Sequence, residues 1–457
     1  MTSIISVSRP EEQAFQTRVD RFFHHLKLSN FLQICNFYKE AGVSSTTVFK
    51  ELFSLVFHGK NLYRSLNSQN ETLPFRKNTA YRFLNSHRFN WERLLKLCTT
   101  KLVQEVDPLT ADDRQSVLVI DDSLLSRNRS KKVELLAKVF DHTSHKFCKG
   151  FRMLTLGWSD GNTFMPLGFT LLSGSKDANV LTEAKRQDGR TLAHKRRVRA
   201  RSNTIDAVIE LLRAAKDIPA RYVLFDSWFT MPKTIARVKR ENRDVIGMMR
   251  ITEKAYYEYQ GQWIDVKQIY AQAGFDSKNH GVIGSVLVKL REDRDSTERV
   301  DARIVFVRDR RSDNWLAILS TDIELDAEEV VRIYGKRWDI EVFFKVCKHH
   351  LALAKEFQGR SYDMQVAHTT IVFLRYAMLA IESRKANDER TIGDLFYYLR
   401  EELADIKLSH SLMLLVNTLR EILNDMPMIS EAMANDIMDA FLNALPHPLK
   451  QKLLLSA

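Results

Sequence analysis

The N-terminal part of the chain carries apolar residues at helical spacing. In RVDRFFHHLKLSNFLQICNFYKEAG and TTVFKELFSLVF they recur every three or four positions, which is typical of amphipathic helices. Gly42 separates the two stretches, and Ser44 or Ser45 can cap the second one as in a helix-turn-helix, although an ordinary helical hairpin fits the pattern equally well. Residues 1–110 are therefore expected to form a helical domain.

From about Ser116 the pattern changes to that of β-strands. SVLVID, a stretch near VELLAKVFDH, RMLTLGWS and TFMPLGFTLLSG predict a meander of strands, and RYVLFD predicts a buried strand. Helices are expected over 203–215 and MPKTIARVKREN, with another strand at DVIGMMR. This order indicates an α/β core. We assign 111–250 to its first part and 327–375 to its second part.

Residues 251–326 interrupt that core. YYEYQGQWIDV, IGSVLVKL, RVDARIVFVRD and WLAILST alternate or run apolar, with Gly261, Gly281 and polar turns between them. They predict an all-β insertion. Residues 376–457 contain amphipathic segments such as DLFYYLREEL and LLVNTLREIL, which predict a C-terminal helical region that serves either dimerisation or packing within the chain.

Composition narrows the class of protein. A chain of 457 residues should divide into two to four domains. Its 69 Lys and Arg against 57 Asp and Glu give a net charge of +12, which favours a polyanionic partner without proving one. The four cysteines lack paired spacing and indicate free thiols. No run reaches the ~18 apolar residues of a membrane span, so a soluble cytoplasmic protein is expected.

An acidic residue ends each of two apolar runs. VLVID ends at Asp121, and YVLFD ends at Asp226. A later stretch, IYGKRWDIEVFFKVCKHH, adds Tyr334, Arg337, Glu341 and Lys348. On one helix, at about 100° per residue, these four would share a stripe roughly 60° wide. Two strand-end carboxylates and one on a helix suit a pair of divalent ions, since Mg²⁺ prefers oxygen ligands and two ions can stabilise a phosphoryl displacement.

The spacing Y-x2-R-x3-E-x6-K of these four residues resembles the motif of bacterial DDE transposases of the insertion-sequence-4 family. IDDSLLSR resembles the family's first-aspartate segment and VLFDSWFT the second, so the resemblance runs from about 117 to about 365. It implies a ribonuclease-H-like core and a catalytic, metal-binding triad of Asp121, Asp226 and Glu341. The implied metal is Mg²⁺, for which Mn²⁺ can substitute. Asp122 is set aside, because alternation turns it to the opposite face of the strand.

The resemblance also implies an activity. The chain would carry out cut-and-paste transposition of an insertion sequence through a hairpin intermediate. Its partners would be double-stranded DNA, as terminal inverted repeats and target, and a second copy of itself in the synaptic complex. Its location would be cytoplasmic and nucleoid-associated. Two alternatives stay open: a metal-dependent nuclease of the same fold, and a catalytically inactive DNA-binding regulator.

DNA contacts are expected from four groups of residues. The motif's Tyr334, Arg337 and Lys348 would hold phosphates at the cut end. In the N-terminal domain, RKNTAYRFLNSHRFNWERLL offers phosphate contacts through Arg76, Lys77 and Arg82. The basic run 185–202 favours backbone contacts through Lys195, Arg196, Arg197 and Arg199. In the family, a tryptophan of the inserted segment stacks on a base that is flipped out of the DNA. We expect Trp315, in preference to Trp263, to have this role.

Overall fold

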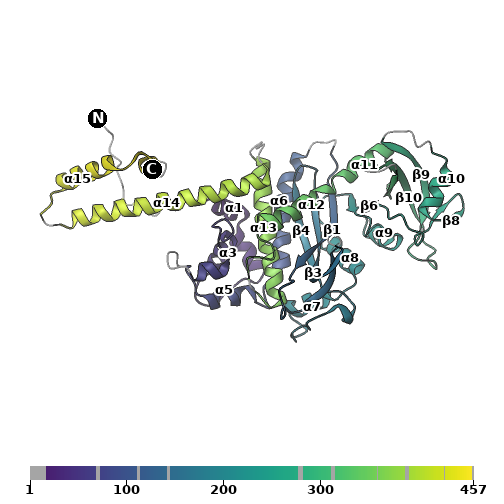
Figure 1. Cartoon of the computed structure of the whole chain (residues 1–457), viewed down its shortest axis with the longest axis horizontal. Helices are drawn as coiled ribbons and strands as arrows, with labels where there is room; N and C mark the ends of the chain where they lie inside the picture. Colours follow the sequence, from purple (N-terminus) through teal and green to yellow (C-terminus); the bar gives the residue numbers. More distant parts are fainter. Residues whose placement is uncertain are drawn as a thin grey trace.

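The computed structural model has an elongated shape, with helices at one side of a central sheet, strands at one end and a helical arm at the other (Figure 1). It describes residues 17–67, 73–110, 114–141, 145–275, 281–309, 314–357, 359–385, 391–426 and 428–454.

The N-terminal region is helical where it is described. Its helices are α1 (Arg18–Leu26), α2 (Leu28–Ile34), α3 (Ser45–Ser54), α4 (Leu62–Leu66), α5 (Lys77–Leu84) and α6 (Trp91–Val106), followed by a 3₁₀ turn, Asp107–Leu109. Ser44 caps α3 by accepting a hydrogen bond from the Thr47 amide. However, α3 buries Val48, Phe49 and Leu52 completely. It is therefore a packing element, which favours the helical hairpin over a helix that reads a DNA groove.

A mixed sheet forms the centre of the molecule. β1 (Val117–Ser126) pairs antiparallel with β3 (Lys146–Ser159), which pairs with β4 (Phe164–Leu172) and, at its start, with β2 (Ala137–Asp141). β5 (Tyr222–Phe225) runs parallel to β1, and β6 (Asp244–Met248) parallel to β5. The connections contain α7 (Leu192–Ala200), α8 (Thr204–Ala214) and α9 (Pro232–Lys239). This sheet with its flanking helices is consistent with the ribonuclease-H-like core.

The inserted segment differs from its prediction in two ways. Its strands are β7 (Tyr257–Tyr259), β8 (Gln262–Ile264), β9 (Val282–Leu290), β10 (Val300–Arg308) and β11 (Trp315–Ser320). It is not all-β, because α10 (Val266–Ala273) begins at a capping box formed by Asp265 and Gln268. Nor is its sheet separate, because β11 pairs with β6 and extends the central sheet.

The four motif residues do not lie on one continuous helix, as the stripe calculation assumed. α11 (Ala327–Gly335) carries Tyr334, whereas Arg337 is the N-cap of α12 (Trp338–His349). Between them the amides of Lys336 and Arg337 donate to carbonyls three residues earlier, at 3.1 and 3.0 Å. Such bonds tighten the last turn of a helix, and Gly335 weakens its continuation. α12 then packs against β1, β4 and α13.

Helix α13 (Tyr362–Lys385) runs through the interior. Its stretch Tyr362–Arg384 has the length and hydropathy of a membrane span, but its most apolar 18-residue window is entirely buried within the protein, as a core helix is. Arg375 on this helix pairs with buried Glu356 at 2.7 Å and donates to the Leu52 and Phe53 carbonyls at 2.7 and 2.8 Å. Since α3 contains both carbonyls, Arg375 fixes the N-terminal helices to the core.

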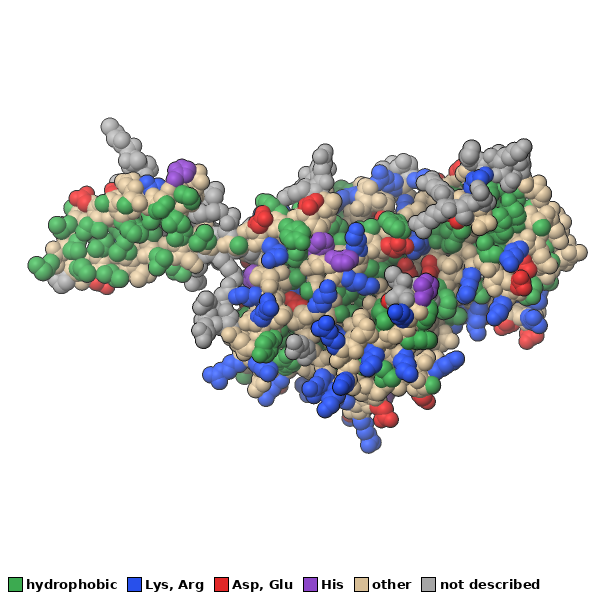
Figure 2. All heavy atoms as spheres, viewed as in Figure 1, with side chains coloured by type: hydrophobic (Ala, Val, Ile, Leu, Met, Phe, Trp, Pro, Cys, Tyr) green, Lys and Arg blue, Asp and Glu red, His purple; other side chains and the backbone are tan. Residues whose placement is uncertain are grey.

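The C-terminal region leaves the body as an arm (Figure 1). It consists of α14 (Ile392–Asn424), α15 (Glu431–Ala444) and α16 (His447–Leu454), and the last two fold back against α14. The space-filling view shows apolar side chains gathered over the end of this arm (Figure 2).

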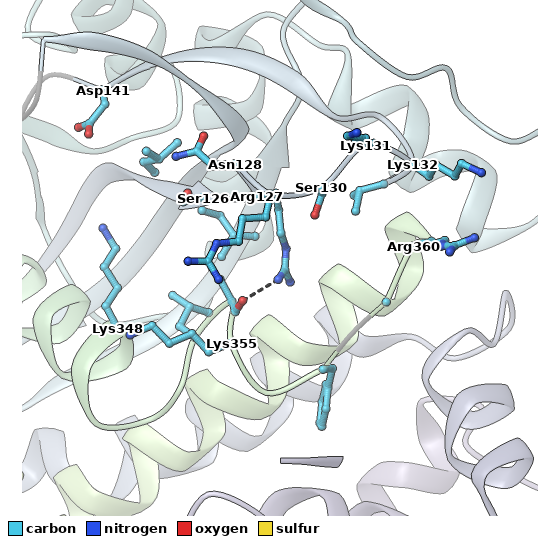
Figure 3. A pocket seen from close by; sticks show the side chains of 18 of the residues that line it. Ser126, Arg127, Asn128, Ser130, Lys131, Lys132, Asp141, Lys348, Lys355 and Arg360 are labelled. Carbon is cyan, nitrogen blue, oxygen red and sulfur yellow. Dashed lines mark hydrogen bonds between the residues drawn. The ribbon is translucent and has the colours of Figure 1, made fainter. Parts of the chain in front are cut away.

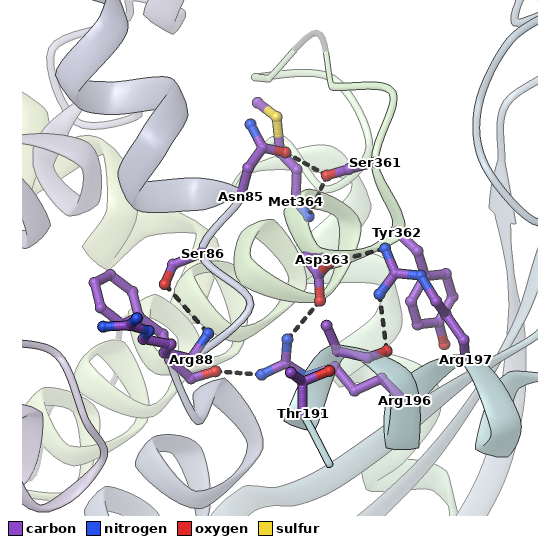
Figure 4. Close-up of polar contacts among 12 residues, drawn as sticks. Asn85, Ser86, Arg88, Thr191, Arg196, Arg197, Ser361, Tyr362, Asp363 and Met364 are labelled. Atoms are coloured by element: carbon purple, nitrogen blue, oxygen red, sulfur yellow. Dashed lines mark hydrogen bonds and ion pairs between the residues drawn. The ribbon is translucent and has the colours of Figure 1, made fainter. Parts of the chain in front are cut away.

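A buried ion network contradicts part of the DNA-contact prediction. Arg196 and Arg197 on α7 are 1% and 5% exposed and share the carboxylate of Asp363, at 2.6 and 2.9 Å (Figure 4). Arg197 also donates to Glu134 at 2.6 Å, and Arg196 to Glu92 at 3.3 Å. The two guanidiniums therefore join α6, α7 and α13 and do not face solvent.

The rest of the basic run is divided. Arg199 pairs with Glu92 at 3.2 Å and with Glu210 at 3.4 Å, so carboxylates of the protein itself neutralise its charge. Lys195 is exposed and stays a candidate for DNA contact. The sequence could not separate these roles, because Glu92 and Asp363 lie far along the chain from α7.

Asp363→Ala should lower the free energy of unfolding by about 3–5 kcal/mol, because it leaves two buried guanidiniums without a shared counter-charge. Urea unfolding followed by circular dichroism measures this. Asp188→Ala is the matched control, since its pair with Arg190 is exposed and its unfolding midpoint should equal that of the wild type. Equal midpoints for both variants would mean that the network contributes nothing to stability.

Candidate active site

The parallel pairing of β1 with β5 brings two aspartates together. The last paired residues are Ile120 and Phe225, so Asp121 and Asp226 follow side by side at the carboxyl end of this strand pair. The Asp226 carboxylate accepts hydrogen bonds from the Trp228 and Phe229 amides, at 3.0 and 3.2 Å. The two strands are adjacent, as expected, with Asp121 on β1 and Asp226 directly after β5.

Arg337 connects the first aspartate with the motif glutamate. Its guanidinium donates to Asp121 Oδ2 at 3.3 Å and to Glu341 Oε1. Tyr334 lies beside it, with its ring centroid 5.9 Å from Arg337 Cζ. Further along α12, Lys348 Nζ donates to Ser123 Oγ at 2.6 Å. Although the motif spans two helices, Arg337 and Lys348 both reach the same stretch of β1, at Asp121 and Ser123.

The acidic pair lies in surroundings that disfavour negative charge. Burial, together with the charge of Asp226, raises the pKa of Asp121 to about 8, and Arg337 opposes this rise. Burial also raises the pKa of Asp226, against the effect of the two amides that it accepts. The pKa of Tyr334 rises to about 12, chiefly through burial. A cation near Asp121 and Asp226 would therefore be stabilised.

These residues fit a divalent metal in part. Carboxylate oxygens are the donors that Mg²⁺ prefers. The single positive charge of Arg337 cannot neutralise both Asp121 and Asp226, and the pKa of each carboxyl group is raised. However, no group of three or more Asp, Glu, His or Cys side chains in the described structure is close enough together to hold an ion. Glu341 instead binds the guanidinium of Arg337.

Asp122 faces different neighbours from Asp121. Its carboxylate accepts from Arg152 Nε on β3 at 2.7 Å and also from the second guanidinium nitrogen. Asp122 thus has a counter-charge of its own, which is consistent with setting it aside as a metal ligand.

The insertion tryptophans do not present free rings. Trp315 stacks on Tyr270 with centroids 4.5 Å apart, and Phe306 meets it edge-on at 5.3 Å. This packing argues against the predicted stacking of Trp315 on a flipped base, because Tyr270 covers one ring face. Trp263 lies under Arg291, whose Cζ is 4.1 Å from the ring centroid, and Arg299 approaches to 5.2 Å.

Two other tryptophans were missed from the sequence. Trp228 follows Asp226 by two residues and is 47% exposed, and Trp338 follows Arg337 directly and is 59% exposed. Arg250 and Arg152 lie near the Trp228 ring, with Cζ 5.7 and 5.9 Å from its centroid. An exposed indole such as that of Trp338 offers a surface on which a nucleic-acid base can stack. The available signal was their position within the two matching segments, VLFDSWFT and KRWDIE.

The N-terminal candidates for DNA contact lie on the surface. Arg76, Lys77 and Arg82 are exposed at the start and along the length of α5. Their positions allow phosphate contacts, so this part of the interpretation stays a prediction.

Comparison with known proteins bears on the same residues. Residues 51–270 match a family described as DDE superfamily endonuclease, and residues 186–378 match one described as Transposase DDE domain. The first range contains Asp121 and Asp226, and the second contains Asp226 and Glu341. No curated protein matches the chain. The two matches support a DDE transposase and a nuclease-type enzyme, without identifying the insertion-sequence-4 family.

Without divalent ions, the free energy of unfolding should fall as pH rises from about 4 to about 8. Over this range the unfolded chain loses the Asp121 proton that the folded state retains, so the folded state binds more protons and higher pH destabilises it. Urea midpoints measured in EDTA across this range test the slope. Asp121→Asn should flatten it, whereas Asp122→Asn should reduce it less, because the charge of Asp122 is only a lesser cause of the raised pKa of Asp121. An unchanged slope for Asp121→Asn would show that Asp121 titrates normally.

Proposed function

We propose that this chain performs cut-and-paste transposition of an insertion sequence of the insertion-sequence-4 type. Its two domain matches support a DDE transposase. One observation carries the proposal. Arg337 joins Asp121, beside Asp226 on the central sheet, to Glu341 on α12. The two aspartate segments and the spaced motif, which lie far apart in the sequence, thereby meet at one place.

The residues divide into two roles. Asp121, Asp226 and Glu341 would hold Mg²⁺, or Mn²⁺ in its place, since DDE transposases generally use divalent metals. The metal, when bound, would supply Lewis acidity to a phosphodiester. Tyr334, Arg337 and Lys348 would hold phosphates of the DNA end, because guanidinium and ammonium groups bind phosphate oxygens.

The reaction follows from the resemblance. Water cuts one strand at the element's end and releases a 3′-hydroxyl. That hydroxyl attacks the opposite strand and produces a hairpin, and hairpin opening precedes joining to target DNA. The substrates are double-stranded terminal inverted repeats and target DNA. We place the protein in the cytoplasm, associated with the nucleoid, where that DNA lies.

A nuclease of the same fold is the second candidate, and the match described as an endonuclease favours keeping it. It would cut DNA ends without joining them to a target. Incubation with Mg²⁺, element ends and a target plasmid separates the two functions, because only a transposase gives joined products. A catalytically inactive regulator is the weaker alternative, since Asp121, Asp226 and Glu341 are all present.

Asp121→Asn, Asp226→Asn and Glu341→Gln should each reduce cleavage at least roughly a hundredfold, or about 2.7 kcal/mol of transition-state stabilisation, while binding to the DNA end persists. Each change removes a ligand charge with little change of volume. A gel that resolves nicked, hairpin and double-strand-break products over time measures the effect, with DNA taken from inverted repeats that flank the gene.

Asp122→Asn is the control for the neighbouring position and should keep substantial activity, because Asp122 pairs with Arg152. If one of the three triad variants cuts nearly as fast as the wild type, that residue has been misassigned. Loss of DNA binding together with cleavage would point to a folding defect.

We also propose that the arm forms a homodimer in the complex that holds two DNA ends. Large apolar side chains lie exposed on α14 and α15 and cannot be buried by the described part of one chain; they include Leu414 (53%), Leu415 (65%), Ile422 (49%) and Met433 (54%). Exposed apolar area of this kind marks protein interfaces.

Replacing Leu414 and Leu415 together with Glu should convert dimers to monomers in sedimentation velocity with DNA ends present, since charges would have to enter an apolar interface. Leu109→Glu is the control, because Leu109 is also 65% exposed but lies outside the arm. Unchanged sedimentation of the double variant would exclude the arm as the interface.

A further inference from the structure

A basic groove lies where β1 ends, and Figure 3 shows residues that line it. It encloses about 1260 Å³ between residues 124–133 and residues 348–360, and we call it the β1 groove. Of the described residues that line it, Asp141 is the one acid. The positively charged lining residues are Arg127, Arg129, Lys131, Lys132, Lys348, Lys355 and Arg360.

The β1 groove and the candidate active site share Lys348 and neighbouring residues of β1. Lys348 lines it and donates to Ser123 Oγ at 2.6 Å, and Ser123 stands two residues after Asp121 on β1. A polymer whose scissile bond lies at Asp121 could therefore continue into the groove without leaving positively charged surface.

Arg127 is the fixed cation of the groove. Its guanidinium donates to the Ala354 carbonyl at 2.6 Å (Figure 3). It also donates to Gln365 Oε1 at 3.0 Å, and both acceptors are neutral oxygens. Burial lowers the pKa of Arg127 to about 10. A partly buried guanidinium held by neutral groups gains from an added anion, and phosphate oxygens are suitable acceptors.

The walls of the groove are built before any ligand arrives. The Lys149 amide donates to Asn128 Oδ1 at 2.8 Å, and the Glu134 amide donates to the Arg360 carbonyl at 2.8 Å. These bonds attach the loop after β1 to β3 on one side and to the segment before α13 on the other. A ligand would therefore meet charges that are already positioned, which reduces the ordering cost of binding.

The groove contrasts with the basic run of α7. There Arg196 and Arg197 are buried against carboxylates, so that their charges are used within the fold. In the groove, Arg129, Lys131 and Lys132 are exposed to solvent. The basic residues of α7 therefore form ion pairs within the fold, whereas these three basic residues of the groove face solvent.

We propose that the β1 groove binds the phosphate backbone of the DNA strand that leaves the active site, with Arg127 facing one phosphate and the exposed cations following the next ones. This rests on the proposed function and adds to it a path for the substrate. Such contacts would position DNA regardless of its sequence.

The test measures binding of the full-length protein to a fluorescein-labelled duplex in EDTA, as a function of salt. A triple variant, Arg129→Ala, Lys131→Ala and Lys132→Ala, should reduce the slope of log affinity against log salt by roughly two to three, since each phosphate contact contributes about 0.9. Arg127 stays unchanged, because it also holds Ala354 and Gln365 in place.

The matched control removes three positive charges at the other end of the parallel strands, before β5 and β6: Arg213→Ala, Lys216→Ala and Arg240→Ala. Its slope should change by less than one. Equal changes in both triple variants would mean that net charge alone matters and would overturn the proposal, as would a wild-type slope for the groove variant.

Failure of the groove can be told from failure of the proposed function. If the groove variant binds with the wild-type slope while the wild-type protein cuts and joins DNA in Mg²⁺, only the groove proposal falls. If the wild-type protein neither binds nor cuts DNA, both fall.

Discussion

The arrangement around the candidate active site depends on the cost of placing two carboxylates side by side in buried surroundings. Parallel pairing of β1 with β5 imposes this arrangement, and burial raises the pKa of both Asp121 and Asp226. The charge of Asp226 adds to the rise at Asp121, and the charge of Asp122 adds to the rise at Asp226. Arg337 offsets part of the cost from the N-cap of α12. The break between α11 and α12 frees that guanidinium to reach Asp121 and Glu341 at once.

Positive charge in this protein has two uses, which the net charge of +12 does not distinguish. Arg196, Arg197 and Arg375 are buried against carboxylates and attach helices to the core. In the β1 groove beside the candidate active site, Arg129, Lys131 and Lys132 are exposed to solvent, and Arg127 is held by neutral oxygens. The first group stabilises the fold, and the second favours an anionic polymer at the place where DNA chemistry is proposed.

The inserted strands matter because they continue the central sheet. β11 pairs with β6, which neighbours the strand that leads to Asp226, so the insertion is held to the core by backbone hydrogen bonds as well as by side-chain packing. Displacement of one sheet segment against the other is therefore opposed. The tryptophan expected to project from this insertion is used in its packing, while Trp228 and Trp338 are exposed nearer the acidic residues.

Much of the fold was already determined by local sequence. Continuous apolar runs led to Asp121 and to Asp226, helical patterns recurred in the N- and C-terminal regions, and the Y-x2-R-x3-E-x6-K spacing marked Arg337 and Glu341. These features are local, because strand and helix periods and motif spacings depend on neighbouring residues. Contacts between distant segments were decided only by the tertiary structure. It buried Arg196 and Arg197 against Asp363, and it joined the insertion to the core sheet. Such outcomes depend on which carboxylates and strand edges the folded chain brings together, and spacing along the sequence carries no record of that.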